Sequence, residues 1–165
     1  ISFLEWRLVE NLQFAWMGGE GLDFPEEEFG IEYDEAVKQA YALVKASGIN
    51  ILRDKELKEV VLSDGKVVGA LFDSWDQGEG IDEYSFDVIV HPSMQQQGLG
   101  KKLIDSAIHT FRSEDRGGET RIKAEVVNKF LVPVLQRYGF KALTPQEAGG
   151  VIPAGVTIMV YPPPA

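Results

Sequence analysis

The chain has 165 residues, of which 44% are hydrophobic and 25% are charged. This length and balance are typical of a globular protein with one core, so we expect residues 1–165 to form a single domain. The sequence contains no cysteine, which excludes disulfides, thiolate metal sites and a cysteine nucleophile. A reducing compartment is therefore expected, and the cytoplasm is the predicted location.

The chain is strongly acidic, with 26 Asp and Glu residues against 16 Lys and Arg residues and a net charge of −10. Nucleic-acid partners are disfavoured, because contacts to phosphates need lysine and arginine. We expect no membrane partner, since the longest apolar runs are far shorter than the ~20 residues of a spanning helix. Acidic residues crowd the stretch from Glu20 to Glu35, where no basic residue occurs.

The N-terminal third predicts one clear helix. The first eight residues alternate loosely as in a strand, although an amphipathic helix that continues through Phe14 and Trp16 fits nearly as well. The acidic, glycine-bearing stretch 18–30 predicts a loop or a mobile flap. Apolar residues then recur at helical spacing, which predicts a helix from Asp34, as its N-cap, to Gly48.

The middle of the chain predicts a β-hairpin followed by a further strand. Residues 59–62 and 66–75 have strand patterns, and the Asp-Gly turn between them is the strongest short-range hairpin signal. After a second glycine-bearing loop, residues 84–90 form a strand whose alternate apolar side chains, from Tyr84 onward, share one face.

Four more elements follow this strand: a helix over 99–112, a strand over 121–126, a helix over 129–138 and a closing strand over 156–161. Pro133 lies within the second helix, which indicates either a late helix start or a kink. This order predicts a mixed sheet with helices packed on it, an α/β or α+β domain.

The most informative stretch joins the strand that ends at Val90 to the helix that begins near Leu99. The first turn of a helix leaves backbone N–H groups without partners, and the helix dipole adds positive charge there, so a phosphate is stabilised. Gly98 and Gly100 would let a phosphate approach the backbone, because a Cβ at either position would project into the ligand. The stretch therefore predicts an anion-binding site.

The spacing of Gln95, Gly98 and Gly100 resembles the [QR]-x-x-G-x-[GA] pattern of the GNAT superfamily of N-acetyltransferases, without assigning a subfamily. A second segment, Asn128 followed by Gly139-Phe140, is similar to another part of that family. The resemblance covers residues 50–161, whereas 1–50 correspond to a variable substrate-side region. It implies a GNAT-like fold, with a mixed, mostly antiparallel sheet and helices on both faces.

The resemblance also implies acetyl-CoA as co-substrate and no metal. The backbone of Val88, Ile89 and Val90 would pair with the pantetheine arm, and the N–H group of Val90 or its neighbour would stabilise the oxyanion. Asn128 is a further candidate contact to the cofactor. The pyrophosphate would lie on the turn and the helix start, formed by Gln95, Gln96, Gln97, Gly98, Leu99, Gly100 and Lys101.

The catalytic acid is where the sequence departs from the family. The tyrosine that protonates the leaving thiolate commonly lies seven residues after the asparagine, and this position is Leu135 here. Tyr138, about one helical turn further on, is the candidate substitute. The other interpretation of Tyr138 is a partly buried tyrosine that closes the helix.

Several residues are candidate bases. Glu83 and Tyr84 lie near the start of the central strand, with Asp87 on the same strand and Asp73 on the preceding one. The alternative for each carboxylate is a solvated charge at the surface or at a strand end. His91 directly follows the strand and is either a proton shuttle or an ordinary turn residue.

These features predict direct transfer of an acetyl group to a primary amine of a small molecule or a peptide. The acidic stretch favours a cationic acceptor, or a lysine or N-terminal amine, whereas Trp16, Trp75 and Phe29 would favour an arylalkylamine. The main alternative is a regulatory or interaction module that binds acetyl-CoA with little or no catalysis, which Leu135 supports. The sequence is also compatible with a homodimer.

Overall fold

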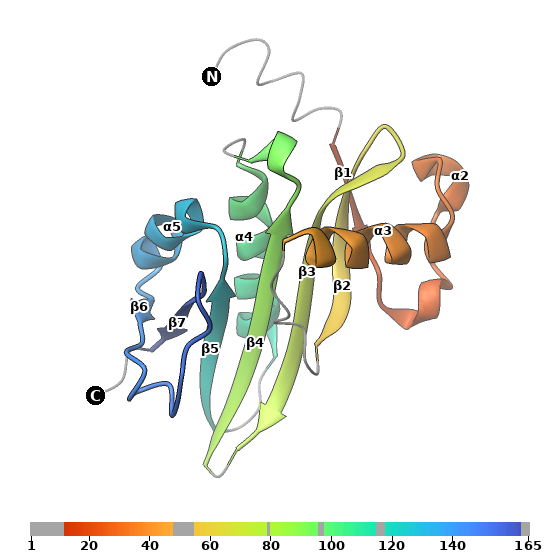
Figure 1. Ribbon diagram of the computed structural model, residues 1–165. Helices are drawn as coiled ribbons and strands as arrows, with labels where there is room; N and C mark the ends of the chain where they lie inside the picture. The colour runs from red at the N-terminus through yellow and green to blue at the C-terminus, as the bar shows by residue number, and fades with distance from the viewer. Residues whose placement is uncertain (1–11, 48–54, 79, 96–97, 115–117, 163–165) are drawn as a thin grey trace.

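The computed structural model describes residues 12–47, 55–78, 80–95, 98–114 and 118–162. Across these residues the strands form one seven-stranded sheet in the order β1-β2-β3-β4-β5-β7-β6 (Figure 1). Of the described strand pairs, only β4 and β5 run parallel. The predicted mixed, mostly antiparallel sheet is therefore confirmed. No helix in the described ranges is long and apolar enough to cross a membrane.

The strands are β1 (Leu12–Trp16), β2 (Glu56–Ser63), β3 (Lys66–Gln77), β4 (Ile81–Val90), β5 (Glu119–Val126), β6 (Lys141–Ala142) and β7 (Thr157–Tyr161). The α-helices are α2 (Glu26–Phe29), α3 (Tyr33–Ala46), α4 (Leu99–Ser113) and α5 (Val132–Arg137). Three short 3-10 turns are η1 (Gly19–Gly21), η2 (Pro92–Met94) and η3 (Lys129–Leu131).

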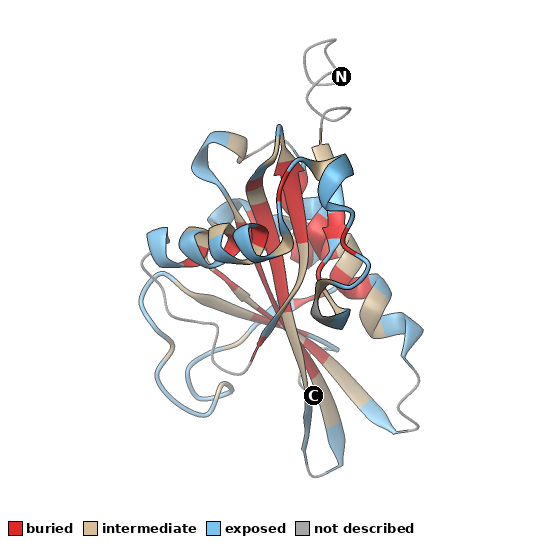
Figure 2. Ribbon diagram, turned by 90° about the vertical axis from the view of Figure 1, so that its right-hand side faces the viewer, coloured by how far each residue is buried: buried red, intermediate tan, exposed pale blue. Residues whose placement is uncertain are grey.

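Helices cover both faces of the sheet, and each face has its own core. On one face α3 buries Ala36, Ala40 and Val44 in the cluster that contains Ile89. On the other face α4 and α5 pack on the cluster that contains Tyr84 and its alternating neighbours. Figure 2 shows the buried residues concentrated in the central strands and on the helix sides that face them. The predicted alternation along β4 is confirmed.

The predicted hairpin between β2 and β3 is also confirmed. Asp64 and Gly65 have φ values of 50° and 72°, and a two-residue turn that matches the strand twist needs a positive φ at both positions. Other elements begin or end at different residues than predicted. β1 contains Phe14 and Trp16, so they belong to a strand and not to a helix, while the first eight residues lie outside the described ranges.

Three predicted segments differ in detail. The stretch predicted as a loop over 18–30 contains η1 and α2. The N-cap of α3 is Glu32 and not Asp34, because the Tyr33 N–H group already bonds Glu26 Oε1 at 3.1 Å. The segment 129–138 divides into η3 and α5, with the proline in the first turn of α5, where its missing N–H group costs no helical bond.

Candidate active site

β4 and β5 pair along only part of their length. Their parallel register begins at Ile81 and Glu119 and ends at Phe86 and Ala124. β4 nevertheless stays paired with β3 as far as Val90, and β5 stays paired with β7. The two strands therefore separate after Phe86 and Ala124, a point we call the fork, and a gap opens between their C-terminal ends (Figure 1).

Backbone groups of β4 face this gap. The His91 N–H group donates to Val68 O on β3 at 2.8 Å. Because successive residues of a strand direct their backbone groups to opposite sides, the N–H and C=O groups of Val88 and Val90 face the gap. The Gln95 side chain confirms this direction, since its Nε2 lies 3.5 Å from Val90 O. The gap is thus lined by backbone groups without a strand partner.

Two cavities meet at the gap. The larger, of about 770 Å³, lies between α3 and the ends of β4 and β5. The smaller, of about 190 Å³, lies beside the first turn of α4 and the start of α5. Both cavities are lined by Val90, Gln95, Asn128 and Leu131. Cavities associated with opposite faces of the sheet therefore adjoin where β4 and β5 separate.

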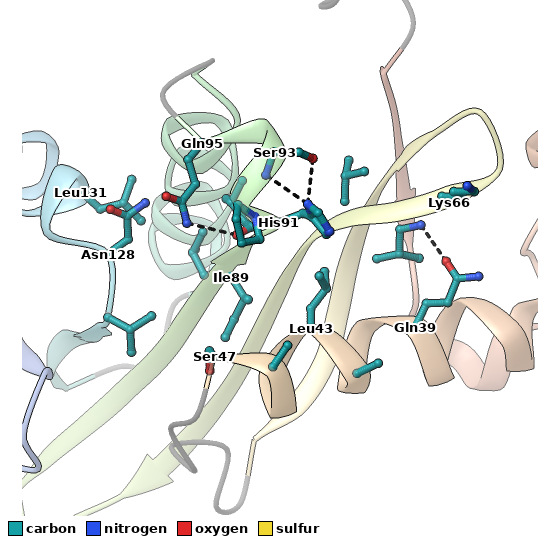
Figure 3. Close-up of a pocket in the computed structure, with 18 residues that line it drawn as sticks. Gln39, Leu43, Ser47, Lys66, Ile89, His91, Ser93, Gln95, Asn128 and Leu131 are labelled. Atoms are coloured by element: carbon teal, nitrogen blue, oxygen red, sulfur yellow. Dashed lines mark hydrogen bonds between the residues drawn. The ribbon is translucent and has the colours of Figure 1, made fainter.

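The larger cavity has a mostly aliphatic wall. α3 contributes Ala42, Leu43 and Ala46, and β4 contributes Ile89 from the opposite side. Figure 3 shows polar residues at both ends of the cavity, with His91 and Ser93 between them. Gln95 and Asn128 lie at the end nearest the gap, whereas Gln39 and Lys66 lie at the far end.

The first turn of α4 faces the smaller cavity. Gly98 is the N-cap residue, with a φ of 79°, and no atom lies within 4 Å of the position that a Cβ would occupy. The space next to its backbone is therefore open, as an anion-binding turn requires. Lys101, which is exposed, also lines this cavity. Gln96 and Gln97 lie outside the described residues.

Gly100 is in close contact with Leu131 of η3. A Cβ on Gly100 would lie 2.6 Å from Leu131 Cδ2, so the glycine makes room for Leu131. Gly100 also lines the smaller cavity, where its backbone is open to a ligand. Leu99 is buried in the α4 core, which leaves only its backbone to a ligand. The Asn128 side chain accepts a hydrogen bond from the Phe130 N–H group at 3.0 Å and so caps η3.

Comparison with known families agrees with this geometry. Residues 25–154 match the family model of the acetyltransferase (GNAT) domain. The chain belongs to the GNAT acetyltransferase family. A GNAT domain makes the chain an acetyl-CoA-dependent acyltransferase by class. The match extends into the N-terminal region that was expected to be variable. No curated protein matches the chain.

Solved structures share the fold at low identity. Arabidopsis thaliana Naa50, in complex with a bisubstrate analogue, has a TM-score of 0.53 and 13% identity over 92% of this chain and 98% of that chain. Escherichia coli ElaA has a TM-score of 0.53 and 10% identity over 90% and 97% of the two chains. The structure of yncA from Salmonella typhimurium with its cofactor acetyl-CoA has a TM-score of 0.50 and 20% identity over 92% of this chain and 93% of that chain.

Tyr84 of this GNAT domain lies away from the gap. Its hydroxyl donates a 2.6 Å hydrogen bond to Asp73 Oδ2, and the same oxygen pairs with Lys58 Nζ at 3.0 Å. Burial raises the pKa of Tyr84, and the Asp73 charge raises it further. Tyr84 and Asp73 therefore form a polar contact within the core on the α4 face, and neither lines a cavity described above.

Glu83 is held in ion pairs on the opposite face. Its Oε2 accepts from Arg121 Nε at 2.8 Å, and its Oε1 lies 3.1 Å from Lys123 Nζ. Burial alone would raise the pKa of Glu83, but the bond from Arg121 and the charge of Lys123 outweigh it and lower the pKa. A carboxylate stabilised in this way is a weak base.

Tyr138 lies at the C-terminal end of α5, where its hydroxyl bonds Asp105 on α4. This hydrogen bond is the main reason that the pKa of Tyr138 is raised. Leu135, at the position of the family tyrosine, is 1% exposed and packs in the core at the gap. Tyr138 lines neither cavity, so the structure does not bring it to the backbone of Val88 and Val90.

Charged residues that the sequence did not single out as a group lie at the fork. Asp87 and Glu125 directly follow the last paired residues of β4 and β5. Lys55 lies between them, with its Nζ 2.9 Å from Asp87 Oδ2 and 3.3 Å from Glu125 Oε1. Burial raises the pKa of Asp87 to about 7, although the Lys55 charge opposes the rise. Asp87 therefore changes charge near neutral pH.

His91 lines the larger cavity and also bonds the turn that follows it. Its Nδ1 accepts from the Ser93 N–H group at 3.1 Å, which places the ring proton of the neutral form on Nε2 (Figure 3). This arrangement is typical of a histidine that orders a turn. The Nδ1 lone pair, which would take up a proton, already accepts the Ser93 N–H group, so the arrangement does not favour His91 as a proton acceptor.

The acidic stretch lies at the other end of α3. Glu26, Glu27 and Glu28 form α2 and line a separate shallow surface pocket, not the larger cavity. The aromatic candidates are dispersed too: Trp16 is 58% exposed on β1, and Trp75 stacks on Phe111 of α4. Phe29 packs on Phe24. Among the described residues no cluster of three His, Asp or Glu side chains is arranged to bind a metal ion.

Proposed function

We propose that this protein transfers an acetyl group from acetyl-CoA directly to a primary amine that occupies the larger cavity. The observation that carries the proposal is the gap between β4 and β5, because it joins the cavity at α4 to the cavity at α3. A donor held from one side and an acceptor held from the other would meet there without a covalent enzyme intermediate.

The residues present fit the donor. Acetyl-CoA, when bound, supplies an acetyl group activated as a thioester. The gap-facing backbone groups of Val88 and Val90 can pair with the amide groups of the pantetheine arm, as an added strand would. The N-terminus of α4, with the open space at Gly98, suits the pyrophosphate. The Val88 and Val90 N–H groups are also the candidate oxyanion donors.

The wall of the larger cavity favours an acceptor with an apolar body. Ala42, Leu43, Ala46 and Ile89 would contact that body, and His91 Nε2 would donate a hydrogen bond to a carbonyl or a similar group. The acidic residues of α2 lie elsewhere, so a polycation gains little from them. A small-molecule or peptide amine with an apolar side fits better than a polyamine.

Asp87 is the group we assign as proton acceptor. It is the candidate carboxyl at the fork, and a pKa of about 7 lets it take a proton near neutral pH. Asp87 also pairs with Lys55 and also lines neither cavity. Unlike Glu83, Tyr84 and Asp73, however, it lies at the fork, directly next to the gap. Because the Asp87 side chain is 0% exposed, the proton would reach it through the interior of the site.

A thioester-consumption assay over apolar, peptidic and cationic amines tests the proposal, with Gly98→Trp as the variant. The tryptophan would fill the open space at the start of α4, so acetyl-CoA turnover should be lost. Gly149→Trp is the matched control, because Gly149 has the same φ of 79°, has open space around it and lines neither cavity. CoA binding without turnover on any amine would favour the regulatory module instead.

A further inference from the structure

Two carboxylates face each other where β4 and β5 separate. If the parallel register continued past Phe86 and Ala124, the next residues to pair would be Asp87 and Glu125. Paired strands lie about 4.8 Å apart, so two like charges at this position would repel each other across the seam. The strands stop pairing at this position.

A single ammonium group joins the two carboxylates. Lys55 Nζ lies 2.9 Å from Asp87 Oδ2 and 3.3 Å from Glu125 Oε1, so the side chain spans the seam. The side chains of Lys55 and Asp87 are 4% and 0% exposed, and that of Glu125 is 22% exposed. Solvent therefore screens the contact to Asp87 little, and screens the contact to Glu125 more.

The contact to Lys55 is the main compensation for burying Asp87. Neither oxygen of Asp87 has a well-aligned hydrogen-bond donor among the described residues. Lys123 on β5 is a further cation that acts on Asp87, while Glu125 opposes ionisation. Phe72, opposite Asp87 on β3, contributes no charge. Removing the ammonium would raise the pKa of Asp87 further, because Lys55 is the main charge that lowers it. Above that pKa, a buried carboxylate would face another carboxylate, which is strongly unfavourable.

We infer that Lys55 is a positioning residue that sets the width of the gap between β4 and β5, and thereby the affinity for the pantetheine arm. The inference rests on the proposed function, because it assumes that the arm of CoA lies in this gap. Lys55 lines neither cavity, so it acts through the two strands and not by touching the ligand. Without Lys55 the ammonium no longer joins the two strands and, where Asp87 is ionised, the carboxylates repel, so the gap walls at Val88 and Val90 move away from β5.

The Kd for CoA, measured by calorimetry at pH 9.5 so that Asp87 is ionised, tests this inference without needing any acceptor. Lys55→Met should raise the Kd about tenfold, and Lys55→Arg should keep most of the affinity. Lys58→Met is the matched control, since Lys58 makes a comparable ion pair with Asp73 on the α4 face. The control should leave the Kd within about twofold of the unaltered chain.

The charge-balanced triple variant Lys55→Met, Asp87→Asn, Glu125→Gln separates positioning from direct binding. It removes the repulsion together with the ammonium, so CoA affinity should return to within about threefold of the unaltered chain. The defect of Lys55→Met should also be smaller at pH 5.5, where Asp87 is protonated. If the triple variant binds as weakly as Lys55→Met, the lysine acts on CoA itself and the inference is wrong.

Two further outcomes are decisive. An unaltered chain that does not bind CoA contradicts the proposed function, whereas equal binding by the unaltered chain and Lys55→Met contradicts only the role of Lys55. Should Lys55→Met fail to fold, the double variant Lys55→Met, Glu125→Gln replaces it. Near-normal affinity of that variant supports repulsion between carboxylates as the cause, and weak binding by the folded double variant overturns it.

Discussion

Gly100 of α4 and Leu131 of η3 are in such close contact that a Cβ on the glycine would lie 2.6 Å from Leu131 Cδ2. Leu131 lines both cavities, so this contact links the anion-binding turn to the wall of the gap. The second glycine of the family pattern therefore acts through packing. The first, Gly98, has open space around it and a positive φ, which points to backbone conformation and ligand access.

Gly100→Ala should weaken CoA binding by displacing Leu131. A contact of 2.6 Å cannot persist, but Leu131 Cδ2 is the end of a flexible side chain, so a change of its rotamer relieves the contact at a cost of about 1 kcal/mol. We expect the Kd for CoA to rise about threefold while the circular dichroism spectrum stays unchanged. Gly150→Ala is the control, because a Cβ there meets no atom within 4 Å. Equal Kd values for the two variants would show that Leu131 moves aside without any effect on CoA binding.

The pH dependence of turnover should follow Asp87. If its carboxylate accepts the proton, kcat/KM rises about tenfold per pH unit below its pKa and levels off above it. Burial places that pKa at about 7. The profile of Asp87→Asn should lose this inflection together with most of the rate. An unchanged inflection in the variant would assign it to another group, such as the acceptor amine.

Asp87 should also make folding stability depend on pH. Its pKa is about 7 in the folded chain, against 3.8 for an unperturbed Asp, so between these values the folded state holds a proton that the unfolded state has lost. This contribution to stability is present below pH 3.8 and is lost as the pH rises to 7, by up to about 4 kcal/mol.

Asp87→Asn does not titrate, so its free energy of unfolding relative to the unaltered chain should increase from pH 4 to pH 8. Urea denaturation at the two pH values measures this difference. A relative stability that falls as the pH rises would mean that Lys55 holds the pKa of Asp87 below its ordinary value.

The sequence predicted the parts of this site that depend on local chemistry. The hairpin turn needs a positive φ at Asp64 and Gly65, and these residue types adopt it readily. The strand, turn and helix around Gly98 were likewise evident from their own residues. The fork was not, because the end of pairing between β4 and β5 depends on segments far apart in the chain.

The same limit applies to single residues. Lys55 showed no signal, since a lysine before a strand is ordinary and its two partners lie 32 and 70 positions further along the chain. Tyr138 fitted a helical pattern next to the family position, but the packing of α5 on α4 turns its hydroxyl to Asp105. Helical spacing fixes which residues share a face, whereas the neighbouring helix decides what that face contacts.

Tyr138→Phe should therefore leave catalysis largely intact. The variant loses one hydrogen bond to Asp105, for a stability cost of about 1 kcal/mol. We expect kcat to stay within about twofold, measured with saturating acetyl-CoA and a good amine. Asp105→Asn, which alters the same contact from the other side, is the control. A fall in kcat of about 100-fold in Tyr138→Phe alone would identify it as the general acid.

Charge reversal in α2 distinguishes an acidic docking surface from a structural helix. Glu27 and Glu28 are exposed and far from the larger cavity, so Glu27→Lys and Glu28→Lys should leave kcat/KM within about twofold even for cationic amines. Glu26 differs, because its Oε1 accepts the Tyr33 N–H group at the start of α3. Glu26→Ala should lower the free energy of unfolding by about 0.5–1 kcal/mol without changing kcat/KM. If reversal at Glu27 and Glu28 instead lowers kcat/KM for cationic amines alone, in a salt-dependent way, α2 steers the acceptor, and the aliphatic cavity is not what selects it.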